Sequence, residues 1–323
     1  MAQTRSAQAT APTRSAPSVI ARGGTGPWRR IAQERWMYLF IIPGALYFLV
    51  FAYLPLLGNV IAFKDYSPFL GILESPWAGL ENFRKLVTDR DFHIALANTL
   101  KIELLQLAFA FPAPLLLALV LNSIISERTK RGMQSLVYLP HFLSWIVLGG
   151  ILLDILAPAG LVNRPLVALG LKPVLFLGSN AIFQPTLIFT NLWKEVGWAT
   201  IIYLAALMSI DPGLHEAAAI DGADRLRRIL HVNLPGISSV VILIACLNLG
   251  NVLQAGFEQV LILYNPLVYA SGDILDTYVY RAGLISAQYS LAGAVGLLKS
   301  VLSFVLIVLA YRLATRFSGY RIF

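Results

Sequence analysis

The stretch Glu216-Ala217-Ala218-Ala219-Ile220-Asp221-Gly222 interrupts an otherwise apolar chain, and Asn233-Leu234-Pro235 closes the interruption downstream. Hydrophobic segments stand on both sides of it, near residues 184–209 and 236–264. A polar, helix-favouring segment between two such hydrophobic segments is typical of the place where a membrane protein leaves the lipid. What this segment meets there decides what the protein does.

Long uncharged runs determine the class of protein. The 323 residues are 57% hydrophobic and only 13% charged, whereas a soluble domain carries about 25% charged residues. Residues 36–63, 104–126, 132–153 and 232–257 contain no Asp, Glu, Lys or Arg. A membrane-spanning helix needs about 20 such residues. These runs therefore exclude a large soluble core and predict an all-α integral membrane protein.

The hydrophobic pattern predicts a short tail followed by one membrane domain. Residues 1–30 are rich in Ala, Ser, Thr, Gly, Pro and Arg and contain no acid, so we expect a disordered basic tail rather than a nucleic-acid-binding arm. No cleavable signal peptide is evident, because the first apolar run starts near residue 36 and is too long for one. We expect a membrane domain over residues 31–323 with six spans, near 36–63, 94–125, 132–156, 184–209, 236–264 and 290–315.

Lys and Arg residues predict the orientation of these spans. The side that holds both termini and the loop at residues 210–235 carries 15 of the 25 Lys and Arg residues, the other side carries seven, and three lie within spans. Cytoplasmic loops of membrane proteins carry the excess of Lys and Arg. Both termini and the 210–235 loop are therefore expected in the cytoplasm.

The 210–235 loop is long enough for two short helices. Asp211-Pro212 is typical of a helix N-cap followed by proline at the first helical position, and Gly222 permits a turn after the first helix. Leu226, Ile229 and Leu230 share one face of the second. The pattern fits a solvated interfacial loop, and it equally fits a docking element for a cytoplasmic partner.

A family resemblance favours the docking element. The loop resembles the EAA loop of ATP-binding-cassette (ABC) importer permeases, whose pattern is Glu-Ala-Ala, three residues, Gly, nine residues, Ile, one residue and Leu-Pro. Only Val232, in place of isoleucine, departs from it. In that family the loop forms the coupling helix that sits in a cleft of the ATPase subunit. The resemblance implies ATPase-coupling roles for Glu216, Ala217, Ala218, Asp221, Gly222, Leu234 and Pro235.

The resemblance extends over nearly the whole chain after residue 30. Tyr138-Leu139-Pro140 and the tracts 276–281 and 289–297 look like the carbohydrate-uptake branch of type I permeases. Within it the oligosaccharide and polysaccharide importers fit best, with the first permease subunit of alginate importers as the nearest expectation. The resemblance implies a six-helix permease of the bacterial inner membrane.

It also implies several partners: a second permease subunit, expected to be a different chain, two ATPase subunits and a solute-binding protein outside the cell. The carbohydrate would pass through the permeases, and membrane lipid would surround them. We expect no bound nucleic acid.

Polar residues inside two spans mark a candidate path for the carbohydrate. Ionisable residues in spans are costly and point to function. In each span the polar residues lie within an arc of about 100–120° of a helix. Aromatic rings could stack on sugar faces and amides bind hydroxyls, although the same residues could simply pair helices through hydrogen bonds. Lys101, Glu103 and Lys299 are weaker candidates. The proposed path residues are Asn191, Trp193, Lys194, Glu195, Trp198, Asn248, Asn251, Gln254 and Glu258.

The sequence offers no sign of an enzyme. It has no Gly-rich phosphate loop with its lysine, and no Cys, His or acid cluster at metal-ligand spacing. We therefore expect no cofactor or metal on this chain, with ATP and Mg²⁺ used by the partner ATPases. An ion-gradient-driven secondary sugar transporter is the main alternative, but it would need no ATPase dock. A membrane glycosyltransferase would need an acidic catalytic domain that the chain lacks.

Overall fold

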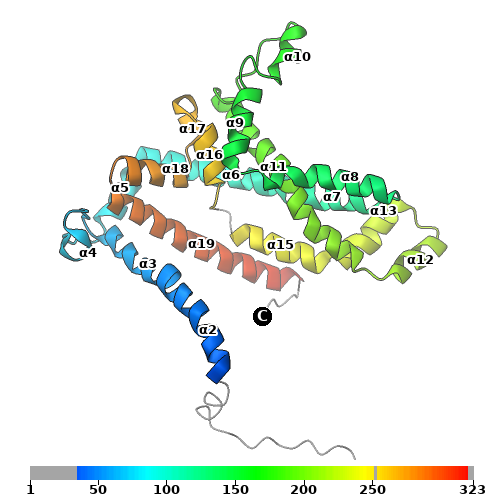
Figure 1. The fold of residues 1–323 in the computed structure, drawn as a ribbon, viewed down its shortest axis with the longest axis horizontal. Helices are drawn as coiled ribbons and strands as arrows, with labels where there is room; N and C mark the ends of the chain where they lie inside the picture. The colour runs from blue at the N-terminus through cyan, green and yellow to red at the C-terminus, as the bar shows by residue number, and fades with distance from the viewer. Residues whose placement is uncertain (1–34, 251–252, 319–323) are drawn as a thin grey trace, which may run out of the picture. The chain divides into compact units, whose positions relative to one another are not determined.

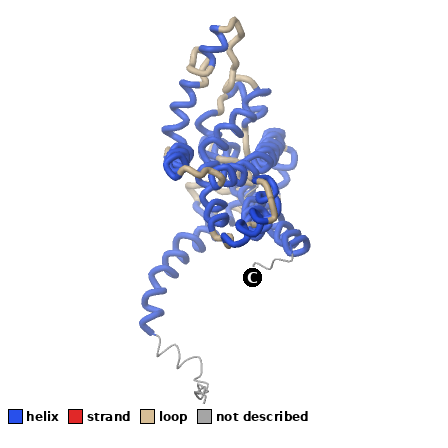
Figure 2. Tube along the Cα trace, turned by 90° about the vertical axis from the view of Figure 1, so that its right-hand side faces the viewer, coloured by secondary structure: helices blue, strands red, loops and turns tan. Residues whose placement is uncertain are grey.

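The computed structural model describes residues 35–250 and 253–318. The chain divides into two compact units, Met1–Leu57 and Gly58–Phe323. The described residues form helices joined by loops, with no strand among them (Figure 2). The all-α prediction is thereby confirmed for this part of the chain. The predicted tail at residues 1–30 lies outside the described residues.

The described part of the first unit is one interrupted helical rod. It comprises α2 (Arg35–Phe48), the π-helical turn η1 (Leu49–Tyr53) and α3 (Leu54–Leu56). The rod contains Pro43 inside α2 and Pro55 at the start of α3. Proline has no N–H to donate, and helices absorb it by local changes such as a π turn. None of the residues in η1 and α3 is buried.

The second unit begins with η2 and continues through a bundle of helices to α11. Figure 1 shows α10 projecting from this unit. The bounds in chain order are η2 (Leu57–Phe63), α4 (Gly71–Glu74), α5 (Glu81–Thr88), α6 (Arg90–Ala110), α7 (Pro112–Asn122), α8 (Glu127–Tyr138), η3 (Leu139–Phe142), α9 (Trp145–Ile155), α10 (Asn163–Ala168) and α11 (Asn180–Met208).

The same unit continues from α12 to the C-terminal helix. Figure 1 shows α12 projecting at a different end of the unit from α10. The bounds are α12 (Pro212–Ile220), α13 (Arg225–Arg228), η4 (Ile229–Asn233), α14 (Leu234–Gly236), α15 (Ser238–Gly250), α16 (Phe257–Leu263), η5 (Pro266–Val268), α17 (Tyr269–Gly272), α18 (Leu275–Val279), η6 (Tyr280–Ile285) and α19 (Tyr289–Ser318).

Three helical stretches in the described residues are long and apolar enough to cross a membrane: Trp36–Phe63, Arg90–Asn122 and Tyr289–Leu309. Three bent pairs of helices pass the same test together, which gives up to six spans if each pair counts as one. The pairs are Glu127–Phe142 with Trp145–Ile155, bent by 101°, Asn180–Met208 with Pro212–Ile220, bent by 71°, and Arg225–Gly236 with Ser238–Leu249, bent by 65°.

Two of the predicted spans differ from the helices in the structure. The run at 132–156 is not one straight helix, because the chain leaves the helix after η3, at Leu143 and Ser144, and turns by 101° into α9. The run at 236–264 contains two helices, α15 and α16, and Gly256, the N-cap of α16, has a left-handed φ of 65°. Hydropathy counts composition and does not register such breaks, so it predicted continuous spans.

Helix α11 is the central element of the second unit. Its first half contributes Phe183 and Leu187 to one buried hydrophobic cluster, together with residues of α9 and α16. Its second half contributes Tyr203, Leu204 and Leu207 to another, together with residues of α7. Because α11 is packed along its length, side chains on its middle turns are held in fixed positions between these two clusters.

A close backbone contact fixes α8 against the middle of α11. A Cβ atom added at Gly197 would lie 2.2 Å from the carbonyl oxygen of Val137. We expect Gly197→Ala to push the two helices apart and to lower the free energy of unfolding by about 1–3 kcal/mol. Gly132 in α8 has no atom within 4 Å of such a Cβ, so Gly132→Ala is the matched control. Thermal unfolding in detergent measures both, and equal midpoints for the two variants would contradict the contact.

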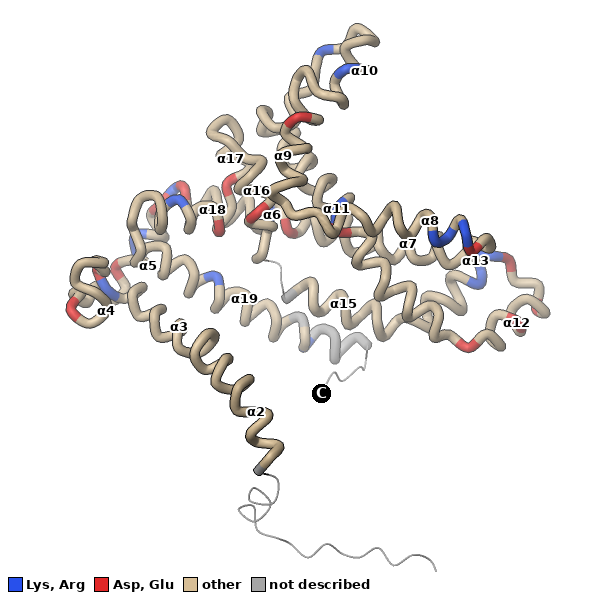
Figure 3. The backbone as a smooth tube through the Cα atoms, in the orientation of Figure 1, with Lys and Arg blue, Asp and Glu red and all other residues tan. Residues whose placement is uncertain are grey.

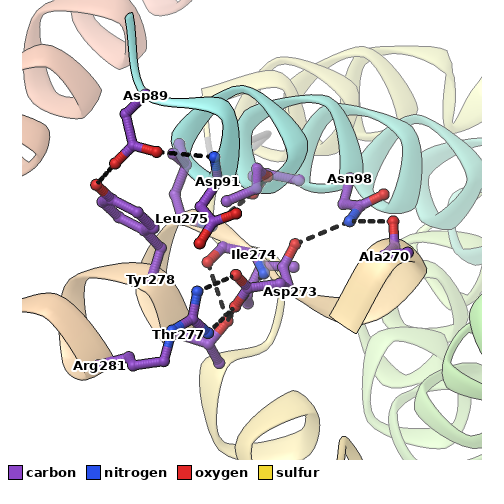
Figure 4. Close-up of polar contacts among 12 residues, drawn as sticks. Asp89, Asp91, Asn98, Ala270, Asp273, Ile274, Leu275, Thr277, Tyr278 and Arg281 are labelled. Carbon is purple, nitrogen blue, oxygen red and sulfur yellow. Dashed lines mark hydrogen bonds and ion pairs between the residues drawn. The ribbon is translucent and has the colours of Figure 1, made fainter. Parts of the chain in front are cut away.

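A polar network ties α6 to the segment α17–α18 (Figure 4). Asn98 on α6 donates hydrogen bonds to the carbonyl oxygens of Ala270 and Asp273, both at 3.1 Å. The guanidinium of Arg281 donates to both carboxylate oxygens of Asp273, at 3.0 and 2.6 Å. A bidentate pair of this kind has a fixed geometry, so it anchors the start of α18.

A second contact joins the start of α6 to the end of α18. The Tyr278 hydroxyl donates to the Asp89 carboxylate at 2.5 Å, and the same carboxylate caps α6 through the N–H of Asp91. Burial, with the neighbouring Asp89 carboxylate, raises the pKa of Tyr278. The phenol therefore stays protonated and keeps donating this bond. The tract 276–281, which resembles carbohydrate-uptake permeases, thus contacts the N-terminal end of α6 through Tyr278.

Candidate functional site

The predicted coupling loop folds as a short helix with a specific start and end. Asp211 caps α12 by accepting a hydrogen bond from the N–H of Gly213 at 2.9 Å, and Pro212 opens the helix. At its end, the N–H of Ala223 donates to the carbonyl of Ala218 and that of Gly222 to Ala219. This is a Schellman motif, which needs a left-handed residue, and Gly222 has a φ of 74°.

Helix α12 is fully outside the core. None of its residues is buried. Glu216, Ala217, Asp221, Gly222 and Pro235 are exposed, while Ala218 and Leu234 are half-buried. An isolated nine-residue helix is marginal in water, so its two capped ends stabilise it. The arrangement presents a preformed helix for contact with another molecule.

The second part of the loop is anchored, in contrast. Asp224 caps α13 through the N–H of Arg227 at 2.8 Å. The chain then passes through η4 to α14, where Ile229 and Leu234 pack against the buried cluster of α7 and α11. The two halves of the loop therefore differ. Helix α12 has no buried residue, whereas the α13–α14 segment packs on the bundle.

Basic residues gather near this loop. Figure 3 shows Lys and Arg positions on α8 and on α13, and acidic positions at the ends of α12. The basic residues concerned are Arg128, Lys130, Arg131, Arg225, Arg227 and Arg228. They are six of the 15 Lys and Arg residues whose distribution predicted a cytoplasmic loop.

Five of the predicted path residues line one cavity of about 440 Å³. They come from α11, from α15 and from the segment before α16. The five residues are Asn191, Glu195, Trp198, Asn248 and Gln254. The structure thus brings the two predicted polar stripes together at one place.

Helix α6 supplies further polar residues to this cavity. Gln106 accepts a hydrogen bond from the amide of Asn191 at 3.0 Å, and Glu103 lines the same cavity. Oε1 of Glu103, Nε2 of Gln106 and the hydroxyl of Tyr203 are buried and have no hydrogen-bond partner within the described residues. Buried polar atoms without partners are costly. The sequence offered Glu103 only as a weak candidate and gave no signal for Gln106 or Tyr203.

Lys194 does not line the cavity. Its side chain is buried, with Nζ 2.7 Å from Oε1 of Glu195 and 3.2 Å from the carbonyl oxygen of His141. The ammonium also lies 5.4 Å from the ring centroid of Trp145. Its neighbour Trp193 is 45% exposed and does not line the cavity either. Helical spacing grouped Trp193 and Lys194 with the polar residues of α11, but neither side chain lines the cavity.

The predicted stripe of the fifth span ends before Glu258. Glu258 is exposed and does not line the cavity. Gln259 instead is fully buried and donates to the Leu187 carbonyl and the Thr190 hydroxyl, both at 2.8 Å. The break before α16 resets the helical phase, so positions counted from α15 do not carry over. Asn251 lies outside the described residues.

A second cavity of about 730 Å³ adjoins the first through Gln254. Lys299 and Asp276 line it and form an ion pair at 2.5 Å. Phe257 and Tyr280 contribute aromatic rings whose centroids are 6.0 Å apart. Lys299 thus reaches a cavity, as a paired rather than a free cation.

Among the described residues no group of three or more His, Cys, Asp or Glu side chains could hold a metal ion. The polar groups of the two cavities include amides, carboxyl groups, tyrosine hydroxyls, the Trp198 indole and one paired lysine. This composition suits hydrogen bonding to a polar solute.

Residues 110–319 match the family described as binding-protein-dependent transport system inner membrane component. The chain is similar to the polygalacturonan/rhamnogalacturonan transport system permease protein YteP of Bacillus subtilis (strain 168), with 45% identity, covering 89% of this chain and 90% of YteP. It is also similar to protein LplB of the same organism, with 43% identity and coverage of 94% and 96%.

Solved structures show the same architecture. One is the crystal structure of a bacterial ABC transporter involved in the import of the acidic polysaccharide alginate. A chain of it matches with a TM-score of 0.85 and 37% identity, covering 90% of this chain and 99% of that chain. Another is a bacterial alginate ABC transporter in complex with an alginate pentasaccharide-bound periplasmic protein, with a TM-score of 0.85, 36% identity and coverage of 92% and 99%.

These similarities cover nearly the whole chain and confirm the family and the fold predicted from the 216–235 pattern. The relatives are transport subunits of sugar importers and not enzymes. The chain therefore belongs to the binding-protein-dependent transport system inner membrane component family and is a multi-pass type I ABC permease subunit.

Proposed function

We propose that this chain is a permease subunit of an ATP-driven importer of acidic oligo- or polysaccharides. Two similarities support this substrate class. YteP is named for polygalacturonan and rhamnogalacturonan transport, and the structural neighbours belong to importers of the acidic polysaccharide alginate. Galacturonans and alginate both consist of sugars that carry carboxylates. Alginate is one member of this class and galacturonan fragments are another.

The observation that carries the proposal is the exposed, doubly capped helix α12 at the end of α11. A preformed helix with no buried residue is suited to a groove in a partner protein. We assign that groove to an ATPase subunit, with Glu216 at the centre of the contact. Two ATPases would bind ATP and Mg²⁺, while this chain binds no cofactor. Closure of the ATPases would move α12 and, through α11, the cavity.

The complete importer would contain further chains. We propose a second, different permease subunit and a solute-binding protein that delivers the carbohydrate. The neighbouring structure with a periplasmic protein supports the latter. The asymmetry of Lys and Arg supports cytoplasmic termini and a cytoplasmic α12 in the bacterial inner membrane.

We propose that the cavity of about 440 Å³ forms part of the carbohydrate path. Trp198 offers an aromatic face to a sugar ring, and the amides of Asn191, Asn248 and Gln254 can bind hydroxyls. No Lys or Arg among the described residues lines this cavity, so it offers no cation to pair with a carboxylate of the substrate. The acidic groups of the substrate would therefore face other surfaces, Lys299 in the adjoining cavity among them.

Measuring which carbohydrates stimulate ATP hydrolysis tests the proposal. The permease would be reconstituted with its second permease, ATPases and binding protein. Oligogalacturonates, oligoalginates and neutral maltooligosaccharides would be compared at equal chain length. We expect stimulation by one of the acidic families and none by the neutral one. Stimulation by neutral oligosaccharides alone would contradict the proposed substrate class.

A further inference from the structure

His141 lies immediately before the break between two helices of one bent pair. It lies in η3, the short turn between α8 and α9, whose axes differ by 101°. Pro140 opens η3, and Ser144 caps α9 by accepting from the N–H of Val147 at 3.3 Å. The break turns the imidazole and the backbone carbonyl of His141 toward the middle of α11, which packs against both α8 and η3.

His141 contacts three residues on one and a half turns of α11. Its ring stacks on the indole of Trp198, with centroids 4.6 Å apart and planes 4° apart. Its Nδ1 lies 2.7 Å from Oε2 of Glu195, where the carboxylate accepts and the imidazole donates. Its carbonyl oxygen accepts from Lys194 at 3.2 Å. A single residue therefore orients two side chains that line the cavity and the cation behind them.

These contacts restrict both cavity side chains. Glu195 has Lys194 on Oε1 and His141 on Oε2, both at 2.7 Å. Trp198 keeps 48% of its surface exposed although His141 stacks against one face. Trp198 also lines the cavity. Without the imidazole, Trp198 would lose its stacking contact and Glu195 would be held from one side only.

A close backbone contact that does not involve the imidazole already holds α8 against α11, so His141 is needed for the orientation of the side chains rather than for the packing of the two helices. Gly197 lies against the carbonyl of Val137, four residues before His141, with no space for a Cβ. Helix α8 and α11 therefore stay together whether or not the imidazole is present. Loss of the ring would free the indole and the carboxylate within a fixed frame.

We propose that His141 is a positioning residue for the carbohydrate path, which holds the Trp198 ring and the Glu195 carboxylate in the orientation that a passing sugar meets. The inference rests on the proposed function of the cavity. It assigns a part in substrate handling to the break between α8 and α9, far in sequence from the residues that it orients. Aromatic stacking of this kind stabilises an orientation well enough to change binding several-fold.

The test is uptake of labelled oligosaccharide by the reconstituted importer at saturating loaded binding protein. We expect His141→Ala to lower uptake roughly tenfold, with the amount of assembled complex unchanged. His141→Phe keeps a flat ring for stacking and should restore part of the loss, and His141→Asn, which can still donate to Glu195, should restore a different part. His93→Ala is the control, because His93 is exposed, bonds to the carbonyl of Asp89 and lines neither of the two cavities.

A double-variant comparison separates positioning from a general structural role. If His141 acts through Trp198, His141→Ala should add little further loss to Trp198→Ala. Full additivity, unchanged uptake in His141→Ala, or equal loss of assembly in all three His141 variants would overturn the inference. Normal uptake by Trp198→Ala would instead show that the cavity is not the path, so that the proposed path itself fails.

Discussion

Replacing Glu216 by lysine is expected to release the ATPase subunits and to abolish ATP-driven uptake while the permease stays folded. Glu216 is exposed on α12, whose residues are all outside the core, so charge reversal leaves the packing of the bundle unchanged. At the centre of a docking contact, one reversed charge removes an attraction and adds a repulsion. We expect a loss of about 2 kcal/mol or more in ATPase binding. Co-purification of tagged permease with ATPase measures it.

Glu74→Lys provides the matched control for this charge reversal. Glu74 is likewise an exposed glutamate at the surface of a short helix, α4, and the loop charges place it on the opposite side of the membrane. The control variant should retain the ATPase and transport at the normal rate. Retention of the ATPase and of uptake by Glu216→Lys would show that α12 is not the docking element.

Replacing Lys194 by alanine is expected to destabilise the permease rather than to act on the substrate directly. Lys194 is only 6% exposed and neutralises Glu195 from behind the cavity. Removing one member of a buried ion pair leaves the other charge uncompensated, which costs about 3 kcal/mol or somewhat less where one partner is partly exposed. Glu195 is partly exposed, with 38% of its side chain accessible. Thermal unfolding in detergent and the yield of assembled complex measure the loss.

The double variant Lys194→Ala with Glu195→Gln is the control for this effect. It removes both charges, so no unpaired carboxylate remains, and it should recover much of the lost stability. If Lys194→Ala unfolds at the normal temperature and assembles with the normal yield, the ion pair adds no stability. That result would contradict the role assigned to Lys194 from its buried position between Glu195, His141 and Trp145.

Local patterns in the sequence predicted the start and end of helix α12 well. The N-cap at Asp211 and the turn at Gly222 each depend on residues close together in the chain. Of the apolar face predicted for the second piece, only Ile229 packs on the bundle, while Leu226 and Leu230 are exposed. Cap and turn chemistry is local, so spacing alone is informative there. The family pattern over residues 216–235 added the ATPase as the expected partner.

The cavity could be predicted only in part. Helical phase on α11 correctly grouped Asn191, Glu195 and Trp198, because α11 is one uninterrupted helix. The same method misplaced Glu258, because the chain breaks between α15 and α16. The contacts of His141 join residues more than fifty positions apart, and no local pattern encodes such a pairing.

The breaks themselves were invisible to hydropathy. The run at 132–156 reads as a single apolar span, although extended backbone at Leu143 and the cap at Ser144 divide it. Proline within an apolar segment can be tolerated in a membrane helix, so its presence alone does not predict a bend. The position of His141 beside the cavity follows from the packing of η3 against α11, which the sequence does not show.

The most direct test of the account is ATP dependence of transport in proteoliposomes that contain the permease pair and the binding protein, with and without the ATPases. We predict accumulation of an acidic oligosaccharide only when the ATPases and Mg-ATP are present, and none when an ion gradient is imposed in their absence. Accumulation driven by an ion gradient without the ATPases would contradict the account and favour a secondary transporter.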